Sequence, residues 1–243
     1  MSPVAALPVS GDPGAVWRVG YRPDPWRWTP WLFATDEGRF NGRWDDERAK
    51  FRTLYTGESL LGCFLELLAH LQPDEVAWAE LDAIDDDDAA APDFVQPERG
   101  AVDLSWLEDR CYASGHQVGT YAEVTQAESL TFLKRMGVFD RLGIPPRDVD
   151  VSLLKDPRRR TVTRTIARYL FELQDEDRQP LVDGVAFRSR LGDDIRLWAV
   201  FERSESDASE LISPAGEPET IADDHPVLMR AFAMLGLHWA EHR

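Results

Sequence analysis

Side chains that could take part in chemistry gather in one short stretch of the sequence. The motif Gly-Arg-Trp-Asp at residues 42–45 presents Arg43, a β-like run ends at Tyr55, and a helical pattern carries the lone carboxylate of Glu66 between leucines. Arginine suits phosphate because its planar guanidinium donates two parallel hydrogen bonds. A carboxylate can stabilise positive charge that develops during a reaction, and an aromatic ring can stack on a planar ligand group. The stretch therefore holds residue types that an enzyme site needs.

Two predicted elements position these side chains. Residues 51–56 are typical of a short strand, with Tyr55 on one face. Ser59 is a suitable N-cap for a helix over residues 59–71. Glu66 falls beside the apolar stripe of this helix, so its carboxylate can reach a cleft next to the core. The residues expected to face the core are Leu60, Phe64, Leu67, Leu68 and Leu71.

The order of these residues resembles the RES domain, a family named for an arginine, a glutamate and a serine. The family's Gly-Arg-aromatic-Asn/Asp motif matches residues 42–45, its tyrosine matches Tyr55 in the run LYTGES, and its glutamate matches Glu66 in CFLEL. Its serine is matched far downstream by Ser189 in FRSR. The resemblance covers residues 16–82 well and residues 161–202 moderately.

Two further arginines bear on this resemblance. A second copy of the motif, Gly-Arg-Phe-Asn at residues 38–41, presents Arg39. Arg43 is preferred as the motif arginine because its distance from Tyr55 along the chain is closer to the family's spacing. Arg18, in the run VWRVG, matches an arginine near the family's first strand and could be a second cationic clamp.

The resemblance implies an activity. RES domains are toxins of bacterial toxin–antitoxin pairs, resemble ADP-ribosyltransferases in fold and consume NAD. The expected function is cleavage of the nicotinamide–ribose bond of NAD, as a glycohydrolase or phosphorylase and without a metal. Glu66 would stabilise the oxocarbenium-like ribose, and the arginines would bind phosphate or ribose. The implied catalytic residues are Glu66, Tyr55 and Arg43, and the implied NAD-binding residues are Arg18, Arg43, Tyr55 and Ser189.

The sequence leaves alternatives open. Water, phosphate and a protein side chain are all possible acceptors, so an ADP-ribosyltransferase acting on a protein is one alternative. An inactive RES-like module that only binds a partner is another. Each candidate residue also has an ordinary explanation, since an arginine beside a glycine is usually at the surface, a strand tyrosine in the core and a helix glutamate in solvent. The implied partner is an antitoxin with a helix-turn-helix domain.

Composition excludes several classes of protein. The 243 residues carry a formal charge of −17, and nucleic-acid binders need positive surface to displace counterions from phosphate, so no direct nucleic-acid binding is expected. No apolar stretch approaches the roughly 20 residues of a membrane span, and the first residues lack a signal-peptide pattern. Two cysteines make no disulfide scaffold. A cytoplasmic protein is therefore expected.

The expected fold is α+β, with an ADP-ribosyltransferase-like mixed or antiparallel central sheet flanked by helices. Residues 1–15 are expected to be a flexible N-terminus. Residues 16–243 are expected to form a single RES-like domain with an insertion around 135–160 and a C-terminal helical extension. Strands are predicted at 15–21, 51–56, 76–84, 182–190 and 195–202, and helices at 59–71, 127–136, 163–174 and 225–243. Turn signals and mixed polarity mark 105–124, and 204–224 is expected to be irregular.

Three weaker signals complete the sequence. Trp26, Trp28 and Trp31 could line a ligand cleft, but closing the edge of the core is the preferred interpretation. The three arginines at 158–160 are expected to be solvated, with an anion or partner contact as the alternative. His116 is the one histidine placed in a plausible site loop.

Overall fold

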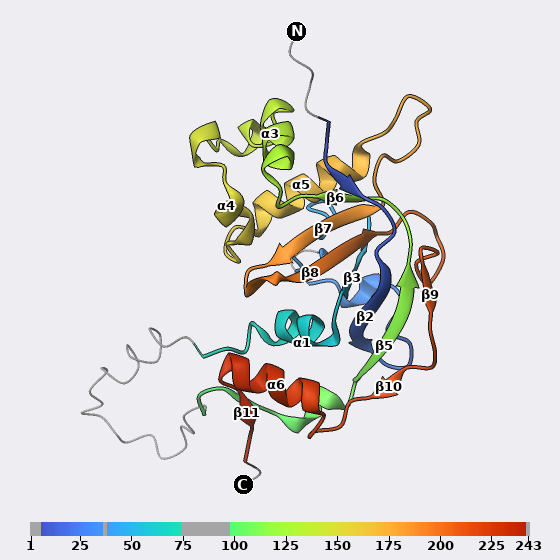
Figure 1. Cartoon of the computed structure of the whole chain (residues 1–243), viewed down its shortest axis with the longest axis vertical. Coiled ribbons are helices and arrows are strands. Elements are labelled where there is room, and N and C mark those ends of the chain that lie inside the picture. Colours follow the sequence, from blue (N-terminus) through green and yellow to red (C-terminus); the bar gives the residue numbers. More distant parts are fainter. Residues whose placement is uncertain (1–5, 36–37, 74–97, 242–243) are drawn as a thin grey trace, which may run out of the picture.

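The computed structural model describes residues 6–35, 38–73 and 98–241. These residues form an α+β fold in which a curled, mixed sheet is flanked by helices (Figure 1). The predicted fold class is therefore confirmed, and the arrangement is consistent with an ADP-ribosyltransferase-like fold.

The central sheet has nine strands in the described part of the chain. Eight of them follow the order β1-β6-β7-β8-β3-β2-β5-β10, and β9 pairs with β5. The β6–β7 pair is parallel, and the other pairs are antiparallel. The strands are β1 (Val9–Ser10), β2 (Gly14–Tyr21), β3 (Thr53–Gly57), β5 (Arg110–Gln117), β6 (Tyr121–Glu123), β7 (Gly184–Ser189), β8 (Gly192–Phe201), β9 (Ile212–Pro214) and β10 (Glu219–Thr220). A separate parallel pair consists of β4 (Ala101–Val102) and β11 (His238–Trp239).

The sheet opens between β2 and β3. These two strands share a single residue pair, Trp17 with Gly57, whereas β2 pairs with β5 along its whole length and β3 does the same with β8. Figure 1 shows β2 and β5 curving away from the β7–β8 hairpin. The opening leaves room on one side of the sheet for a helix, α1 (Leu60–Leu68), which contacts β2, β3 and β8.

Helices cover the sheet at two places (Figure 1). Helix α1 begins after Ser59, whose side chain accepts a hydrogen bond from the Gly62 amide, so the predicted N-cap is confirmed. It packs against α6 (Pro226–Leu235), which starts with a proline. The second group consists of α3 (Ala127–Arg135), α4 (Val151–Lys155) and α5 (Arg160–Glu172). Short 3-10 helices span Trp31–Phe33, Leu104–Leu107, Asp140–Leu142 and Pro146–Asp148.

Two apolar clusters form the core. The larger one joins α1, α5 and α6 to one face of the sheet, and within α1 it buries Leu65 where the sequence predicted Leu67. The smaller one covers the other face and contains Trp26 and Trp28, which agrees with the interpretation that these tryptophans close the core. Trp31 differs, since it is 38% exposed and its ring lies tilted against that of Phe40.

Most predicted elements are present with end points shifted by a few residues. The helix predicted at 225–243 is shorter than expected: it ends at Leu235 because Gly236 adopts a left-handed conformation, and β11 follows. The predicted strand at 76–84 lies outside the described residues. The irregular region predicted at 204–224 is partly wrong, because it contains β9 and β10. For residues 105–124 the sequence indicated only turns and mixed polarity, whereas the structure has β5 and β6 there. Strand β5 was therefore missed, although it pairs with all of β2. Residues 135–160 contribute apolar side chains to the larger cluster: Val138, Phe139, Val149, Leu153 and Leu154.

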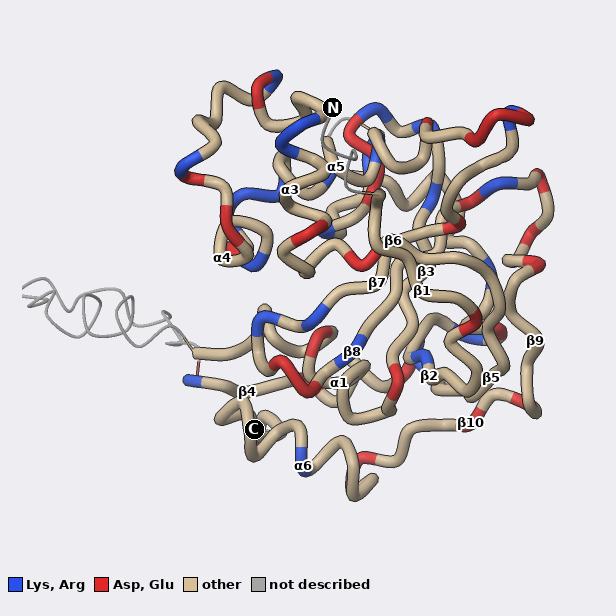
Figure 2. The backbone as a smooth tube through the Cα atoms, turned by 45° about the horizontal axis from the view of Figure 1, so that its top comes forward, with Lys and Arg blue, Asp and Glu red and all other residues tan. Residues whose placement is uncertain are grey.

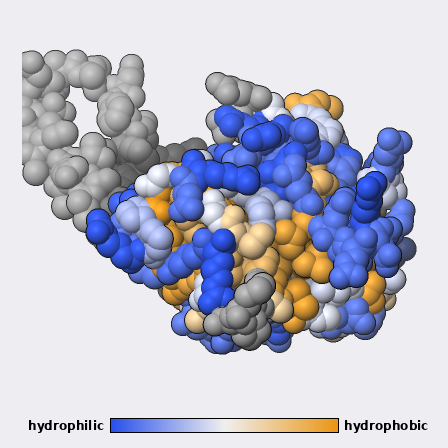
Figure 3. Space-filling view, turned by 90° about the horizontal axis from the view of Figure 1, so that it is seen from above, coloured by the Kyte–Doolittle hydropathy of each residue, from blue (hydrophilic) through white to orange (hydrophobic). Residues whose placement is uncertain are grey.

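The surface of the described part is charged with both signs. Acidic and basic positions are scattered over the backbone of the described residues (Figure 2). The face seen in Figure 3 carries apolar side chains across its middle, between hydrophilic areas. No helix in the described ranges is long and apolar enough to cross a membrane.

Candidate active site

Glu66 and Ser189 meet although they lie 123 positions apart in the sequence. The Ser189 hydroxyl donates a hydrogen bond to Glu66 Oε1 and accepts one from the Leu191 amide at 2.9 Å. Ser189 is fully buried at the end of β7, where the register with β8 shifts. Because the hydroxyl has both a donor and an acceptor partner, its proton is directed at the carboxylate. The structure thus fixes the orientation of Glu66 from a neighbouring strand.

Tyr55 is tied to the arginine motif through Asp45. The Tyr55 hydroxyl donates to Asp45 Oδ1 at 3.1 Å and accepts from the Trp44 amide at 2.8 Å. Burial and the Asp45 carboxylate hold the pKa of Tyr55 well above its usual value, so the hydroxyl keeps its proton. Burial also raises the pKa of Asp45, against the hydrogen bonds from Gly42 and Tyr55 and the charge of Arg164.

Gly42 is required by close packing within this turn. Its amide donates to Asp45 Oδ2. A Cβ atom at this position would lie 2.5 Å from both Asp45 Oδ2 and the Tyr55 hydroxyl, and real Cβ contacts essentially never fall below 3.0 Å. The motif glycine therefore allows the carboxylate and the phenol to approach the backbone that presents Arg43.

Arg43 lies among one carboxylate and two other guanidinium groups. Burial lowers the pKa of Arg43, the charge of Glu66 raises it, and the charges of Arg190 and Arg160 lower it. Its Nη1 also donates to the carbonyl of Leu154 in α4, at 3.5 Å. A partly buried guanidinium beside like charges is stabilised by an anion. The arrangement is therefore suited to an anionic ligand that lies next to Glu66.

The RES domain family model matches residues 15–224. The chain belongs to the RES domain family. None of the curated proteins matches the sequence. Among solved structures, a chain in the crystal structure of the M. tuberculosis MbcT–MbcA toxin–antitoxin complex is similar, with a TM-score of 0.42, 13% sequence identity and 92% of each chain covered.

The two candidate motif arginines of this RES domain have different surroundings. The charge of Glu66 raises the pKa of Arg43. Arg39 instead directs Nη1 at the carbonyl of Glu47, at 3.4 Å, within its own loop. This geometry agrees with the choice of Arg43 made from spacing, and the roles of both in catalysis stay predictions.

Arg18 is placed differently from the other predicted site residues. Its guanidinium lies where β2 and β3 separate and donates to the carbonyls of Tyr55, at 2.7 Å, and Pro25. Burial lowers the pKa of Arg18 to about 10. These contacts make Arg18 a bridge across the opening of the sheet, directly behind Tyr55. A role in binding NAD stays a prediction.

Sequence reasoning missed the arginines of α5 that touch the motif loop. The sequence predicted a helix at 163–174 and assigned its arginines no role, yet Arg164 and Arg168 are each only 7% exposed. Arg164 donates to oxygens of residues 40–42, and Arg168 pairs with Asp46 at 3.1 Å. Two arginines four positions apart, among the threonines and apolar residues of α5, are the signal that could have indicated a buried polar face.

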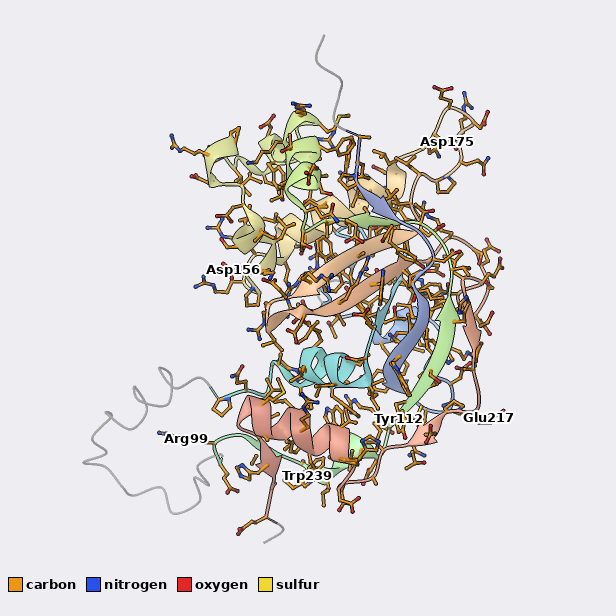
Figure 4. The ribbon with its side chains drawn as sticks, in the orientation of Figure 1. Arg99, Tyr112, Asp156, Asp175, Glu217 and Trp239 are labelled. Atoms are coloured by element: carbon orange, nitrogen blue, oxygen red, sulfur yellow. The ribbon has the colours of Figure 1, made fainter. Side chains whose placement is uncertain are left out.

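Among the weaker candidates, Arg160 reaches the motif loop, where it donates to the carbonyl of Asn41, and the others lie away from this cluster. His116 is exposed and belongs to strand β5, where it pairs with Ala15, so its placement in a loop was wrong. Arg158 and Arg159 pair with Asp156, which Figure 4 labels at the junction of α4 and α5. Among the residues that the structure describes, no three metal-ligating side chains form a cluster.

Proposed function

We propose that this RES domain cleaves the nicotinamide–ribose bond of NAD and acts as the toxin of a bacterial toxin–antitoxin pair. The observation that carries the proposal is the meeting of Glu66 with Ser189, next to Arg43 and Tyr55. These residues come from a turn, a strand, a helix and a distant strand, and they are the ones that the family resemblance implies.

Binding of NAD would use the cationic side of the site. NAD carries a diphosphate, and the planar fork of arginine donates paired, charge-assisted hydrogen bonds to phosphate. Arg43 is the guanidinium best placed for the diphosphate. The charges of Arg160 and Arg190 act on it, so an anion bound there would be attracted by three cations. Tyr55 keeps its phenolic proton and presents a ring that can stack on the nicotinamide. The residues present therefore fit the proposed substrate.

Bond cleavage would use the anionic side. The bond between ribose C1′ and the nicotinamide nitrogen breaks, and its electron pair leaves with nicotinamide. The ribose acquires oxocarbenium character, which a carboxylate stabilises as it does in glycoside cleavage. Ser189 holds Glu66 in place for this role, because its hydroxyl donates to Oε1 while the Leu191 amide fixes the hydroxyl.

The acceptor decides the reaction class. Attack by water at C1′ releases a proton and gives ADP-ribose, whereas attack by inorganic phosphate gives ADP-ribose 1″-phosphate. Attack by a protein side chain would make the chain an ADP-ribosyltransferase. Purified protein should be incubated with NAD with and without phosphate and with a bacterial lysate, and the products separated by chromatography. Release of nicotinamide supports the proposal, and intact NAD under all three conditions would refute it.

A toxin that removes NAD must be inhibited in its own host. We expect an antitoxin with a helix-turn-helix domain that covers the site and contacts DNA itself. Such DNA-binding proteins tend to be basic, and the charge of −17 on this chain would favour their encounter. Because NAD is available there, the proposed reaction takes place in the cytoplasm.

A further inference from the structure

The loop that presents Arg43 has little regular structure of its own. Residues 40–52 form only turns and bends between the start of the motif and strand β3. A loop of this kind holds a fixed shape only when other elements satisfy its backbone groups. Its position therefore depends on the neighbouring helix, α5.

Arg164 supplies most of the contacts between α5 and the motif. Its Nη2 donates to the Phe40 carbonyl at 2.9 Å and to Asn41 Oδ1 at 3.0 Å, and its Nε donates to the Gly42 carbonyl at 3.3 Å. One planar guanidinium thus holds three oxygens on consecutive residues. Because the Arg164 side chain is only 7% exposed, water cannot readily replace its guanidinium as the hydrogen-bond donor to these oxygens.

Further contacts of α5 hold the second half of the loop. Arg168 pairs with Asp46 at 3.1 Å and with Glu172 at 2.6 Å, and Thr165 donates to Glu47 Oε2 at 2.8 Å. The Asp46 carboxylate in turn accepts from the Lys50 amide at 2.6 Å. These groups fix the end of the loop. The three residues that precede Arg43 are held by Arg164 and also by Arg160, which donates to the carbonyl of Asn41.

The residues that Arg164 holds are part of the candidate site. Gly42 donates its amide to Asp45, and Asp45 accepts from the Tyr55 hydroxyl. The charge of Arg164 also acts on Asp45 and favours its ionised form. A shift of residues 40–42 would therefore move the backbone of Arg43 relative to Tyr55 and Glu66.

We propose that Arg164 is a positioning residue that acts through Arg43, holding the motif loop from α5 so that the Arg43 guanidinium lies beside Glu66. The role in turnover rests on the proposed NAD-cleaving function, whereas the role in ordering the loop does not. Lysine at this position would keep the charge but could not span three oxygens with one ammonium group. Misplacement of a reacting group by about 1 Å can cost about 10²-fold in rate.

The test is a double-mutant cycle with Arg164→Lys, Arg43→Ala and the double variant, with Arg159→Gln as the control. Arg159 lies at the start of the same helix, is largely exposed and pairs only weakly with Asp156, at 3.9 Å. Arg164→Lys should lower kcat/KM about 10²-fold. In the background of Arg43→Ala it should have no more than about a threefold further effect, because the contact through which it acts has gone. Losses that multiply in the double variant would overturn the proposal.

A second readout does not depend on turnover. Hydrogen exchange should show faster exchange of the Gly42 and Trp44 amides in Arg164→Lys, since both are bonded within the motif turn. Exchange in β7 and β8 should match the parent protein. Unchanged exchange at residues 39–47, or loss of protection throughout the sheet, would contradict local positioning. If the parent protein leaves NAD intact, the proposed function fails, and the exchange result alone still decides whether Arg164 orders the loop.

Discussion

Replacement of Gly42 by alanine tests the tight turn at the centre of the site. The added methyl group would start 2.5 Å from Asp45 Oδ2 and from the Tyr55 hydroxyl, and these atoms must retreat to at least 3.0 Å. A flexible side chain could move away from the added methyl group at little cost, but the side chains of Asp45 and Tyr55 are held in place. Asp45 is 5% exposed, and the two side chains are bonded to each other and to the backbone of the same turn.

The expected loss follows from that crowding. Overpacking a filled site destabilises a protein by about 1–3 kcal/mol, and the hydrogen bond from the Gly42 amide to Asp45 would be strained at the same time. Relief of the clash moves the backbone that carries Arg43. Since a displacement of about 1 Å can cost about 10²-fold in rate, Gly42→Ala should lose far more activity than stability.

Two measurements on Gly42→Ala decide the matter. Urea unfolding gives the change in the free energy of unfolding, and nicotinamide release from NAD gives kcat/KM. Gly11→Ala is the matched control, because a Cβ at that glycine would meet nothing within 4 Å. Parent-like turnover by Gly42→Ala, or an equal loss in Gly11→Ala, would refute the reasoning about the turn.

Three further predictions concern other parts of the molecule. Arg43→Ala should weaken NAD binding about tenfold more than Arg39→Ala, since the charge of Glu66 acts on Arg43 whereas Arg39 donates to the carbonyl of Glu47 within its own loop, and titration of both variants checks this; a larger loss in Arg39→Ala would reassign the motif. Burial raises the pKa of Cys63 to about 12, so its thiol should stay protonated and unmodified by iodoacetamide at pH 8, and rapid labelling seen by mass spectrometry would show that the helix face is open. Expression of the chain alone should stop bacterial growth and lower cellular NAD, and expression with the neighbouring gene should restore both; normal growth with undiminished NAD would favour a binding module.

Much of the site's scaffold could be predicted from local sequence. Ser59 predicts the start of α1 because its hydroxyl can accept from the first turn, and the observed bond to Gly62 is of that kind. Helical spacing then places Glu66 at the border of the apolar stripe, where it contacts Ser189. The strand ending beside Tyr55 follows from its β-prone composition. In each case the deciding interactions lie within a few residues along the chain.

The remainder depends on contacts between distant segments. Strand β5 reads RCYASGHQ, with glycine, serine and mixed polarity, and it becomes a strand because β2 and β9 pair with it on either side. In the sequence, Arg18 suggested a phosphate clamp. In the fold its guanidinium donates instead to the carbonyls of Pro25 and Tyr55, and Tyr55 lies 37 positions away along the chain. The contacts of Arg164 join positions more than 120 residues apart, so no local pattern could assign its acceptors.

The most direct test of the central claim compares the parent protein with Glu66→Gln. Glutamine keeps the size of the side chain and an oxygen that can accept from Ser189, but it removes the charge that would stabilise the ribose. The proposed mechanism predicts nicotinamide release by the parent protein, a rate about 10²–10³-fold lower in Glu66→Gln, and NAD binding by the variant close to that of the parent. Release of nicotinamide by Glu66→Gln at the parent rate would contradict the assigned role of this carboxylate and, with it, the proposed mechanism.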